Sequence, residues 1–326
     1  MKRIVESIAK ALRDRGSVEA TVSPLPPDVR IDGKRCLVTG ANTGLGKAVA
    51  IEFARRGGHV LMACRGGHPH AGEEVRRASG SDRVEMLRVD LADLRSVHDL
   101  CDTLRNRQVV LDIAVLNAGL MPARARRSHE GFELMFAVHF LANRVLLDRW
   151  LADGVIRPVT AGDAPPRVVF VASEAHRSSG PIDFERFGAF QDYGIRDGLK
   201  YYGLSKLHLC TYATELSRRL NPDAQTRVAV HALCPGPVAS DIAREAPLAL
   251  KPLLAPIMKR FPSPARAAEP VSYLCCAPDP GTRSGMYLHI LREKRPSDLA
   301  TDPANGARLW DVSEALVQRY APVRPA

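Results

Sequence analysis

Short apolar runs alternate with amphipathic segments from about residue 33 onward. The segments between the runs, such as GKAVAIEFARRG (46–57), show helical periodicity. Short apolar runs of this kind are typical of parallel strands that helices cover on both faces. The pattern predicts an α/β fold: a Rossmann-type doubly wound parallel sheet flanked by helices, in a single domain. The expected strands are RCLVTG (35–40), HVLMAC (59–64), RVEMLRVD (83–90), LDIAVLNAG (111–119), RVVFVAS (167–173) and VAVHALCPG (228–236).

The first thirty residues follow a different pattern. Apolar residues recur at helical spacing among charged ones in residues 1–16, which predicts a short amphipathic helix. A proline-rich linker, SPLPPDV (23–29), follows. We therefore divide the chain into an N-terminal segment, 1–30, and a domain, 31–326. Two roles for the helix stay open: packing on the domain, which its small apolar face favours, or peripheral contact with a membrane surface.

Charge changes this picture only slightly. Lys and Arg number 46 against 36 Asp and Glu, which gives a formal net charge of +10. Such a charge can serve nucleic-acid binding, but the basic residues are scattered and no basic run is interleaved with aromatic residues. We expect no nucleic-acid partner and attribute the charge to an anionic cofactor or substrate.

The seven cysteines form no CxxC pair, and most lie in apolar segments. We expect buried, reduced thiols, with neither disulfides nor a metal site. No apolar run approaches the roughly 18 residues that a transmembrane helix requires, and the charged N-terminus is unlike a secretory signal. These features predict a cytoplasmic location and leave a homo-oligomeric state open.

A glycine-rich turn joins the first expected strand to the first helix. Gly40, Gly44 and Gly46 in LVTGANTGLG give the spacing GxxxGxG. Glycines at such a junction let the chain turn tightly and let backbone N–H groups approach a pyrophosphate at the helix N-terminus. The second strand ends in Cys64 and Arg65, where an NAD site usually has an acidic residue. A guanidinium can pair with a 2′-phosphate, so we expect NADP(H) in preference to NAD(H).

Five ordered motifs stand at sensible separations: TGANTGLG (39–46), VDLADL (89–94), LNAGL (116–120), YYGLSK (201–206) and CPGPVASD (234–241). Together they resemble the short-chain dehydrogenase/reductase family, from about residue 33 to the end of the chain. ACR, SKLHL and GARLWDVSEALV resemble its retinol-dehydrogenase-like and protochlorophyllide-reductase-like subgroup.

The resemblance implies where a cofactor would lie. Asp90 and Leu91 would lie against the adenine, and Pro235, Gly236, Val238 and Ser240 would border the nicotinamide. The implied cofactor-binding residues are Gly40, Asn42, Thr43, Gly44, Leu45, Gly46, Arg65, Asp90, Leu91, Asn117, Ala118, Gly119, Tyr202, Lys206, Pro235, Gly236, Val238 and Ser240.

Tyr202 and Lys206 are the candidates for proton transfer. They are four residues apart, so on one helix they share a face. A nearby ammonium stabilises a phenolate and lowers the tyrosine pKa from about 10. The neighbouring Tyr201 forms no YxxxK pair. Ser173 ends the RVVFVAS strand, where the family places its catalytic serine, and its hydroxyl can hydrogen-bond the substrate oxygen.

Two segments point to a bulky hydrophobic substrate. Residues 176–200, between Ser173 and Tyr202, look like the insertion of the same subgroup, whose members handle lipophilic carbonyls or alcohols. Residues 242–264 are apolar and proline-rich and suit a mobile substrate lid. A helix packed on the surface is the alternative for this segment.

His139 stands where the family places a catalytic asparagine, in MFAVHFLANR (135–144). Three interpretations are open. The backbone carbonyl of residue 139 holds the relay water, so the side chain matters little; His139 itself moves protons; or the site is degraded. Asn143 lies one helical turn later and could take the polar role. Because Ser173, Tyr202 and Lys206 are intact, we favour the first and expect His139→Asn to preserve turnover.

These residues predict an NADPH-dependent reductase, or reversible alcohol dehydrogenase, for a bulky hydrophobic carbonyl or alcohol. Tyr202 is its general acid and base. The alternative class is a catalytically weakened NADP-binding regulator or scaffold.

Overall fold

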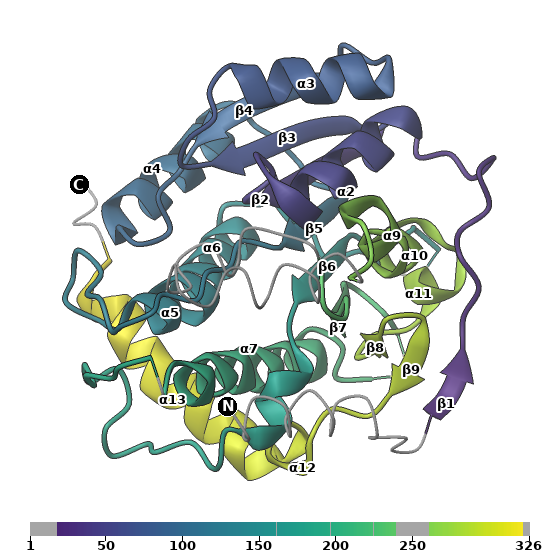
Figure 1. Cartoon of the computed structure of the whole chain (residues 1–326). Coiled ribbons are helices and arrows are strands. Elements are labelled where there is room, and N and C mark those ends of the chain that lie inside the picture. Colours follow the sequence, from purple (N-terminus) through teal and green to yellow (C-terminus); the bar gives the residue numbers. More distant parts are fainter. Residues whose placement is uncertain (1–17, 161, 196, 224, 239–260, 322–326) are drawn as a thin grey trace.

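A nine-stranded sheet runs through the part of the chain that the computed structural model describes, residues 18–321 apart from 161, 196, 224 and 239–260 (Figure 1). In order across the sheet, the strands are β1 (Val18–Thr21), β9 (Arg292–Lys294), β8 (Tyr287–His289), β7 (Ala229–Cys234), β6 (Arg167–Val171), β5 (Ile113–Leu116), β2 (Arg35–Thr39), β3 (His59–Cys64) and β4 (Val84–Arg88).

The strands from β4 to β8 are parallel to their neighbours, while β9 pairs antiparallel with both β8 and β1. Strands β3 and β4 are added to one side of β2, whereas β5 and the strands after it are added to the other side, so the strand order reverses between β2 and β5. In doubly wound sheets, a crevice for ligands opens at the carboxyl ends of the strands at this switch point. The predicted fold class is confirmed.

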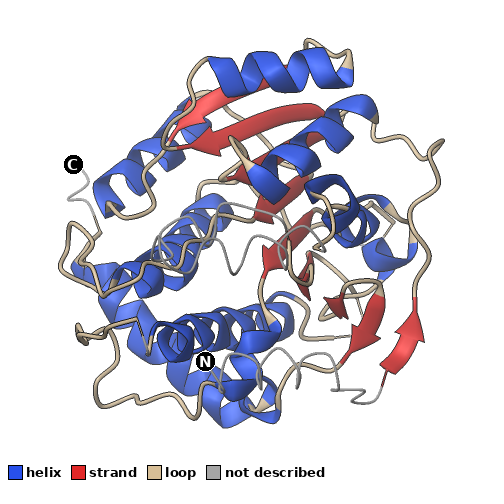
Figure 2. Ribbon diagram, viewed as in Figure 1, coloured by secondary structure: helices blue, strands red, loops and turns tan. Residues whose placement is uncertain are grey.

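Helices cover both faces of the sheet (Figure 2). The apolar strand residues are buried on both faces, which explains why the strands read as continuous apolar runs. One face packs against α2, α3 and α10, and the other against α4, α6, α7 and α13. The helices are α2 (Gly44–Arg55), α3 (His70–Ser79), α4 (Leu94–Asn106), α5 (Leu134–Phe136), α6 (Ala142–Ala152), α7 (Gly198–Leu220), α9 (Pro264–Ala267), α10 (Glu269–Cys276), α11 (Asp279–Thr282), α12 (Asp298–Thr301) and α13 (Pro303–Arg319).

The sheet extends further than the sequence pattern indicates. Strand β1 lies in the segment that we assigned to the N-terminal helix and linker, and it pairs with β9 at the sheet edge. The linker also packs on the body, because Arg56 Nη1 donates to the carbonyls of Pro26 and Val29. The short strands β8 and β9 form a hairpin that supports β1.

Other predictions are tested only in part. All seven cysteines are buried and unpaired, as expected for reduced thiols. Within the described residues, no helix is long and apolar enough to cross a membrane. The predicted helix over 1–16 lies outside the described residues, and so does most of the predicted lid over 242–264.

Candidate functional site

The glycine-rich turn after β2 packs tightly against the end of β5. Gly40 and Gly44 have φ angles of +65° and +54°, which other residues rarely adopt. A Cβ at Gly46 would overlap Asn117 Nδ2 and the carbonyl oxygen of Gly40. The start of α2 therefore packs directly against the loop after β5, with no space for a side chain between them. The backbone N–H groups of the first turn of α2 lie at the switch point. A dinucleotide pyrophosphate fits this arrangement.

Thr39 and Asn117 hold the two strand ends together. Thr39 Oγ1 accepts hydrogen bonds from the backbone N–H groups of Asn117 (2.9 Å) and Ala118 (3.0 Å). Asn117 Nδ2 donates to the carbonyl of Thr39 at 2.8 Å. The sequence places Thr39 only at the start of a motif, whereas the structure shows that its fully buried hydroxyl connects β2 to β5.

Arg65 and Asp90 lie together at the rim of the same edge. Arg65 Nη1 is 3.8 Å from Asp90 Oδ2, and the Arg65 side chain keeps 61% of its surface exposed. Asp90 Oδ1 accepts from the N–H of Ala92, which orients the carboxylate. Leu91 is buried beside it. The guanidinium is therefore accessible to an anion in the crevice.

The loop after β7 also lies at the carboxyl edge of the sheet, because β7 is parallel to β6. Gly236 has a φ angle of +78°, and a Cβ there would meet Ile290 Cγ1 at 3.1 Å. This residue therefore needs to be glycine for the loop to turn against the β8–β9 hairpin. Pro235 and Val238 lie in the same loop, and Ser240 is outside the described residues.

Ser173, Tyr202 and Lys206 are brought together at the carboxyl end of β6. Ser173 caps the 3₁₀ turn Glu174–Ser178, and its Oγ accepts from the N–H of Ala175 at 3.2 Å. Burial raises the pKa of the Tyr202 phenol, and the neighbouring Ser173 side chain acts in the opposite direction. Lys206 Nζ donates to the carbonyl of Val171 at 2.9 Å. The predicted catalytic set is thus assembled around one point.

Burial and charge act on this set in opposite directions. The surrounding protein raises the pKa of the Tyr202 phenol, although part of its surface remains accessible. The Lys206 ammonium lies 5.7 Å from the Tyr202 ring centroid, where positive charge favours the phenolate. Burial in turn lowers the pKa of Lys206 to about 8. The lysine is therefore mostly charged at neutral pH and loses its charge just above it.

His139 lies in the π-helical turn Ala137–Leu141, between α5 and α6, and is fully buried. Its Nε2 lies 3.0 Å from the N–H of Leu120, and its Nδ1 lies 2.8 Å from Ser205 Oγ. The ring meets the Tyr202 ring edge to face, with centroids 5.6 Å apart. Asn143 Nδ2 donates to the backbone carbonyl of His139 at 2.8 Å. Asn143 therefore contacts the carbonyl that we expected to hold a relay water.

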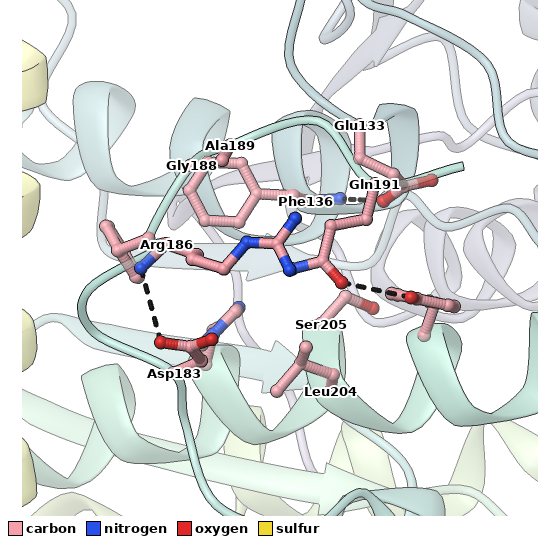
Figure 3. Close-up of a pocket in the computed structure, with 12 residues that line it drawn as sticks. Glu133, Phe136, Asp183, Arg186, Gly188, Ala189, Gln191, Leu204 and Ser205 are labelled. Carbon is pink, nitrogen blue, oxygen red and sulfur yellow. Dashed lines mark hydrogen bonds between the residues drawn. The ribbon is translucent and has the colours of Figure 1, made fainter. Parts of the chain in front are cut away.

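The insertion folds over a neighbouring face of α7. It encloses a small cavity of about 50 Å³, shown in Figure 3. Tyr201 faces this cavity and donates to Gln191 Oε1 at 3.0 Å, so its hydroxyl points away from the catalytic set. The cavity is lined by Glu133, Phe136, Asp183, Arg186, Phe187, Gly188, Ala189, Gln191, Tyr201, Leu204, Ser205 and His208.

Sequence reasoning missed three residues that shape the site. Gly203 lets α7 approach the 3₁₀ turn, because a Cβ there would meet the carbonyl of Ala175 at 2.6 Å. Ser205 connects His139 to the helix, and its position inside YYGLSK was the available signal. Glu174, next to Ser173, accepts from the Tyr287 hydroxyl at 2.8 Å, and no local pattern indicates so distant a partner.

A glycine-rich strand–helix junction beside a Ser–Tyr–Lys set defines a dinucleotide-dependent oxidoreductase of the α/β class. Comparison with known proteins agrees. The family model described as short chain dehydrogenase matches residues 34–181. Retinol dehydrogenase 13 of Mus musculus is 36% identical over 90% of this chain and 86% of its own length. The chain belongs to the short-chain dehydrogenase family.

Two further likenesses support this assignment. Retinol dehydrogenase 14 of Mus musculus is 33% identical, covering 87% of this chain and 86% of its own. Among solved structures, an uncharacterised protein from Mycobacterium Paratuberculosis superposes with a TM-score of 0.66 at 27% identity. That alignment covers 92% of this chain and 100% of the other.

Proposed function

We propose that this protein is an NADP(H)-dependent oxidoreductase that transfers hydride between the nicotinamide and a carbonyl carbon of a bulky hydrophobic substrate. The observation that carries the proposal is the assembly of Ser173, Tyr202 and Lys206 beside the glycine-rich turn. The proton donor, the group that hydrogen-bonds the oxygen and the cofactor crevice all meet at the carboxyl edge of the sheet.

The three residues divide the chemistry of reduction. A bound nicotinamide supplies the hydride. Tyr202 gives its phenolic proton to the substrate oxygen as negative charge develops there, and the Ser173 hydroxyl donates a hydrogen bond to the same oxygen. The Lys206 ammonium stabilises the phenolate that remains on Tyr202. In alcohol oxidation the same groups act in reverse.

Arg65 supports a preference for the phosphorylated cofactor. It is exposed at the rim, and it directly follows the buried Cys64 at the end of β3. A guanidinium there can form paired hydrogen bonds with a 2′-phosphate. Asp90 is 3.8 Å away and competes for it, so we expect a preference for NADP(H) rather than exclusion of NAD(H).

The relatives indicate the class of substrate. Two relatives that align with most of this chain are named retinol dehydrogenase 13 and retinol dehydrogenase 14, and these names give retinol as the substrate. We propose lipophilic aldehydes, ketones or the corresponding alcohols as substrates, with residues 242–264 as a lid over them. We further propose a cytoplasmic location, with residues 1–16 as the site of any membrane contact.

The test is consumption of NADPH, followed by its absorbance, with a panel of retinal-like aldehydes, quinones, steroid ketones and polyketide ketones. Turnover of at least one lipophilic carbonyl is expected. The second candidate, an NADP-binding regulator without turnover, is motivated by His139 in the asparagine position. NADPH binding, followed by its fluorescence, without consumption of any member of the panel would favour that candidate.

A further inference from the structure

The imidazole of His139 is enclosed between two parts of the site that are distant in sequence. On one side is the loop after β5, which includes Gly119 and Leu120; on the other is α7, which carries Tyr202. A Cβ at Gly119 would lie 3.4 Å from Nε2, so the ring packs directly against this loop. None of the His139 surface is exposed.

The hydrogen bonds determine which nitrogen carries the proton. The backbone N–H of Leu120 can only donate, so Nε2 must accept and therefore carries no hydrogen. The proton is then on Nδ1, which donates to Ser205 Oγ. The Ser205 hydroxyl in turn donates to the backbone carbonyl of Tyr202 at 2.8 Å. A continuous chain of hydrogen bonds thus runs from the cofactor-side loop to Tyr202.

Both ring nitrogens of His139 already form hydrogen bonds, so neither is free to bind a further proton. The charged group that faces it is Lys206, and the titratable ring beside it is Tyr202. Burial, followed by the Lys206 ammonium, lowers the pKa of His139 well below its ordinary value. The ring therefore stays neutral in any ordinary assay buffer.

The backbone is shaped to hold the ring in this place. Ala137–Leu141 form a π-helical turn, in which the helix widens by one residue. Asn143, only 2% exposed, donates to the His139 carbonyl and holds the widened turn. The side chain consequently points inward, towards Leu120 and Ser205, rather than along the regular helix face.

We propose that His139 is a positioning residue: a neutral strut that sets the spacing between the loop 117–120, against the cofactor, and the segment of α7 that carries Tyr202. The proposal rests on the proposed function. It assigns the two ends different roles. The Leu120 end holds the cofactor-side loop, and the Ser205 end holds Tyr202 over the reacting oxygen. Catalytic rates are sensitive to displacements of about 1 Å at such positions.

Two substitutions test the Leu120 contact and the Ser205 contact of His139 separately. In His139→Asn, the shorter amide can still donate to Ser205 Oγ but leaves the Leu120 N–H without its acceptor. The Kd and KM for NADPH are expected to rise roughly threefold to tenfold, the usual effect of one lost hydrogen bond, with kcat within about twofold. Ser205→Ala removes the link to Tyr202, so kcat is expected to fall at least about tenfold, with the Kd for NADPH within about twofold.

Two further variants serve as controls. Ser205→Thr keeps the hydroxyl, and Ser205 borders the cavity under the insertion, which has room for the added methyl group. It should restore kcat. His231→Asn is the matched structural control. His231 is 1% exposed and lies away from the site. Like His139, it donates through one ring nitrogen and accepts through the other: Nε2 donates to the carbonyl of Pro280, and Nδ1 accepts from the N–H of Met286. It should lower the Tm and leave the kinetics unchanged.

The outcomes distinguish between three roles of His139. If it positions the two segments, His139→Asn should mainly raise the Kd and KM for NADPH, and Ser205→Ala should mainly lower kcat. The pH–rate profile should then be the same in the wild-type and His139→Asn proteins. If both site variants only lower the Tm, as His231→Asn does, His139 is merely structural and the proposal is overturned. A shifted midpoint in the pH–rate profile of His139→Asn would instead show that His139 moves protons. If the wild-type protein turns over no carbonyl, the proposed function fails, but the NADPH Kd of His139→Asn still tests the strut.

Discussion

Tyr201 and Tyr202 are neighbours in sequence, yet their surroundings on α7 differ completely. The Tyr201 hydroxyl donates to Gln191, and its ring stacks on Tyr193 with centroids 4.6 Å apart. Tyr202 instead contacts Ser173 and lies near the Lys206 ammonium. Both phenols have a lysine ammonium near the ring, since Lys200 Nζ is 5.8 Å from the Tyr201 centroid. Only Tyr202, however, lies beside Ser173, so the two tyrosines can be used as a matched pair.

Tyr202→Phe should lower kcat by about 100- to 10,000-fold, because it removes the hydroxyl that we propose gives its proton to the substrate oxygen. NADPH binding should persist, since the ring shape is unchanged. The measurement is NADPH consumption under saturating substrate, with a fluorescence titration of the cofactor. Tyr201→Phe is the control and should keep kcat within about threefold. Equal rates in the Tyr202 variant and the wild-type protein would rule out the mechanism.

Lys206 should make stability depend on pH in a particular direction. Its pKa is lowered from 10.5 to about 8 in the folded protein. Between these values the unfolded chain binds more protons than the folded one, so the contribution of Lys206 to stability rises with pH. Relative to Lys206→Met, the cofactor-free wild-type protein should gain about 2 kcal/mol in free energy of unfolding between about pH 8 and about pH 10.

Chemical denaturation of both proteins at several pH values measures this difference. Groups other than Lys206 titrate in both proteins and largely cancel in the comparison. A difference that stays constant across the range would show that Lys206 keeps an ordinary pKa. The same variant should also lose turnover, because the phenolate of Tyr202 would no longer face a positive charge.

At the scale of elements, the contact between α7 and the 3₁₀ turn Glu174–Ser178 decides how close Tyr202 comes to Ser173. Gly203 is buried in this contact, and a Cβ there would meet the carbonyl of Ala175 at 2.6 Å. Gly198 begins the same helix, and the atom nearest to a Cβ added there would be 3.8 Å away. A methyl group therefore fits at Gly198 but not at Gly203.

Gly203→Ala should lower the free energy of unfolding by about 1–3 kcal/mol, because the added methyl group forces α7 away from the turn. It should also lower kcat by about tenfold or more, since Tyr202 moves with the helix. Gly198→Ala should leave both unchanged or stabilise the protein by up to about 1 kcal/mol. Thermal unfolding and steady-state rates measure both effects. A fully active Gly203→Ala protein would show that this contact does not position Tyr202.

At the scale of the whole molecule, the sheet gathers residues from distant parts of the chain at one edge. Thr39, Asn117 and Ser173 end the neighbouring strands β2, β5 and β6, or follow directly after them. Arg65 follows β3, beyond β2. A cofactor bound along this edge would contact many elements at once, so its affinity should appear as stability of the entire fold.

NADPH should therefore raise the Tm of the wild-type protein by a few degrees more than NADH does at equal concentration. Arg65→Ser should remove most of that excess, because the 2′-phosphate loses its guanidinium partner. The shift that NADH produces should stay the same in the variant, which serves as the internal control. Thermal shift assays with both cofactors measure this. An undiminished excess would place the phosphate contact elsewhere.

Much of the fold was predictable because its signals are local. Each central strand is a short apolar run, and parallel strands buried on both faces require such runs whatever their partners are. The glycine turn and the Tyr202–Lys206 pair were equally local, since a turn or one helical repeat places their members together. The sequence did not indicate β1, β8 and β9, because these are short strands of three or four residues at one end of the sheet, and their pairing depends on one another.

The sequence by itself indicated the fold class, the glycine-rich turn and the Tyr202–Lys206 pair, because each depends on spacing within a few residues. Only the tertiary structure decided what His139 contacts. Its partners, Leu120 and Ser205, lie 19 and 66 residues away, and a π-helical turn aims the ring at them. Hydrogen bonds between segments so far apart arise from packing, and no local pattern of residues encodes them.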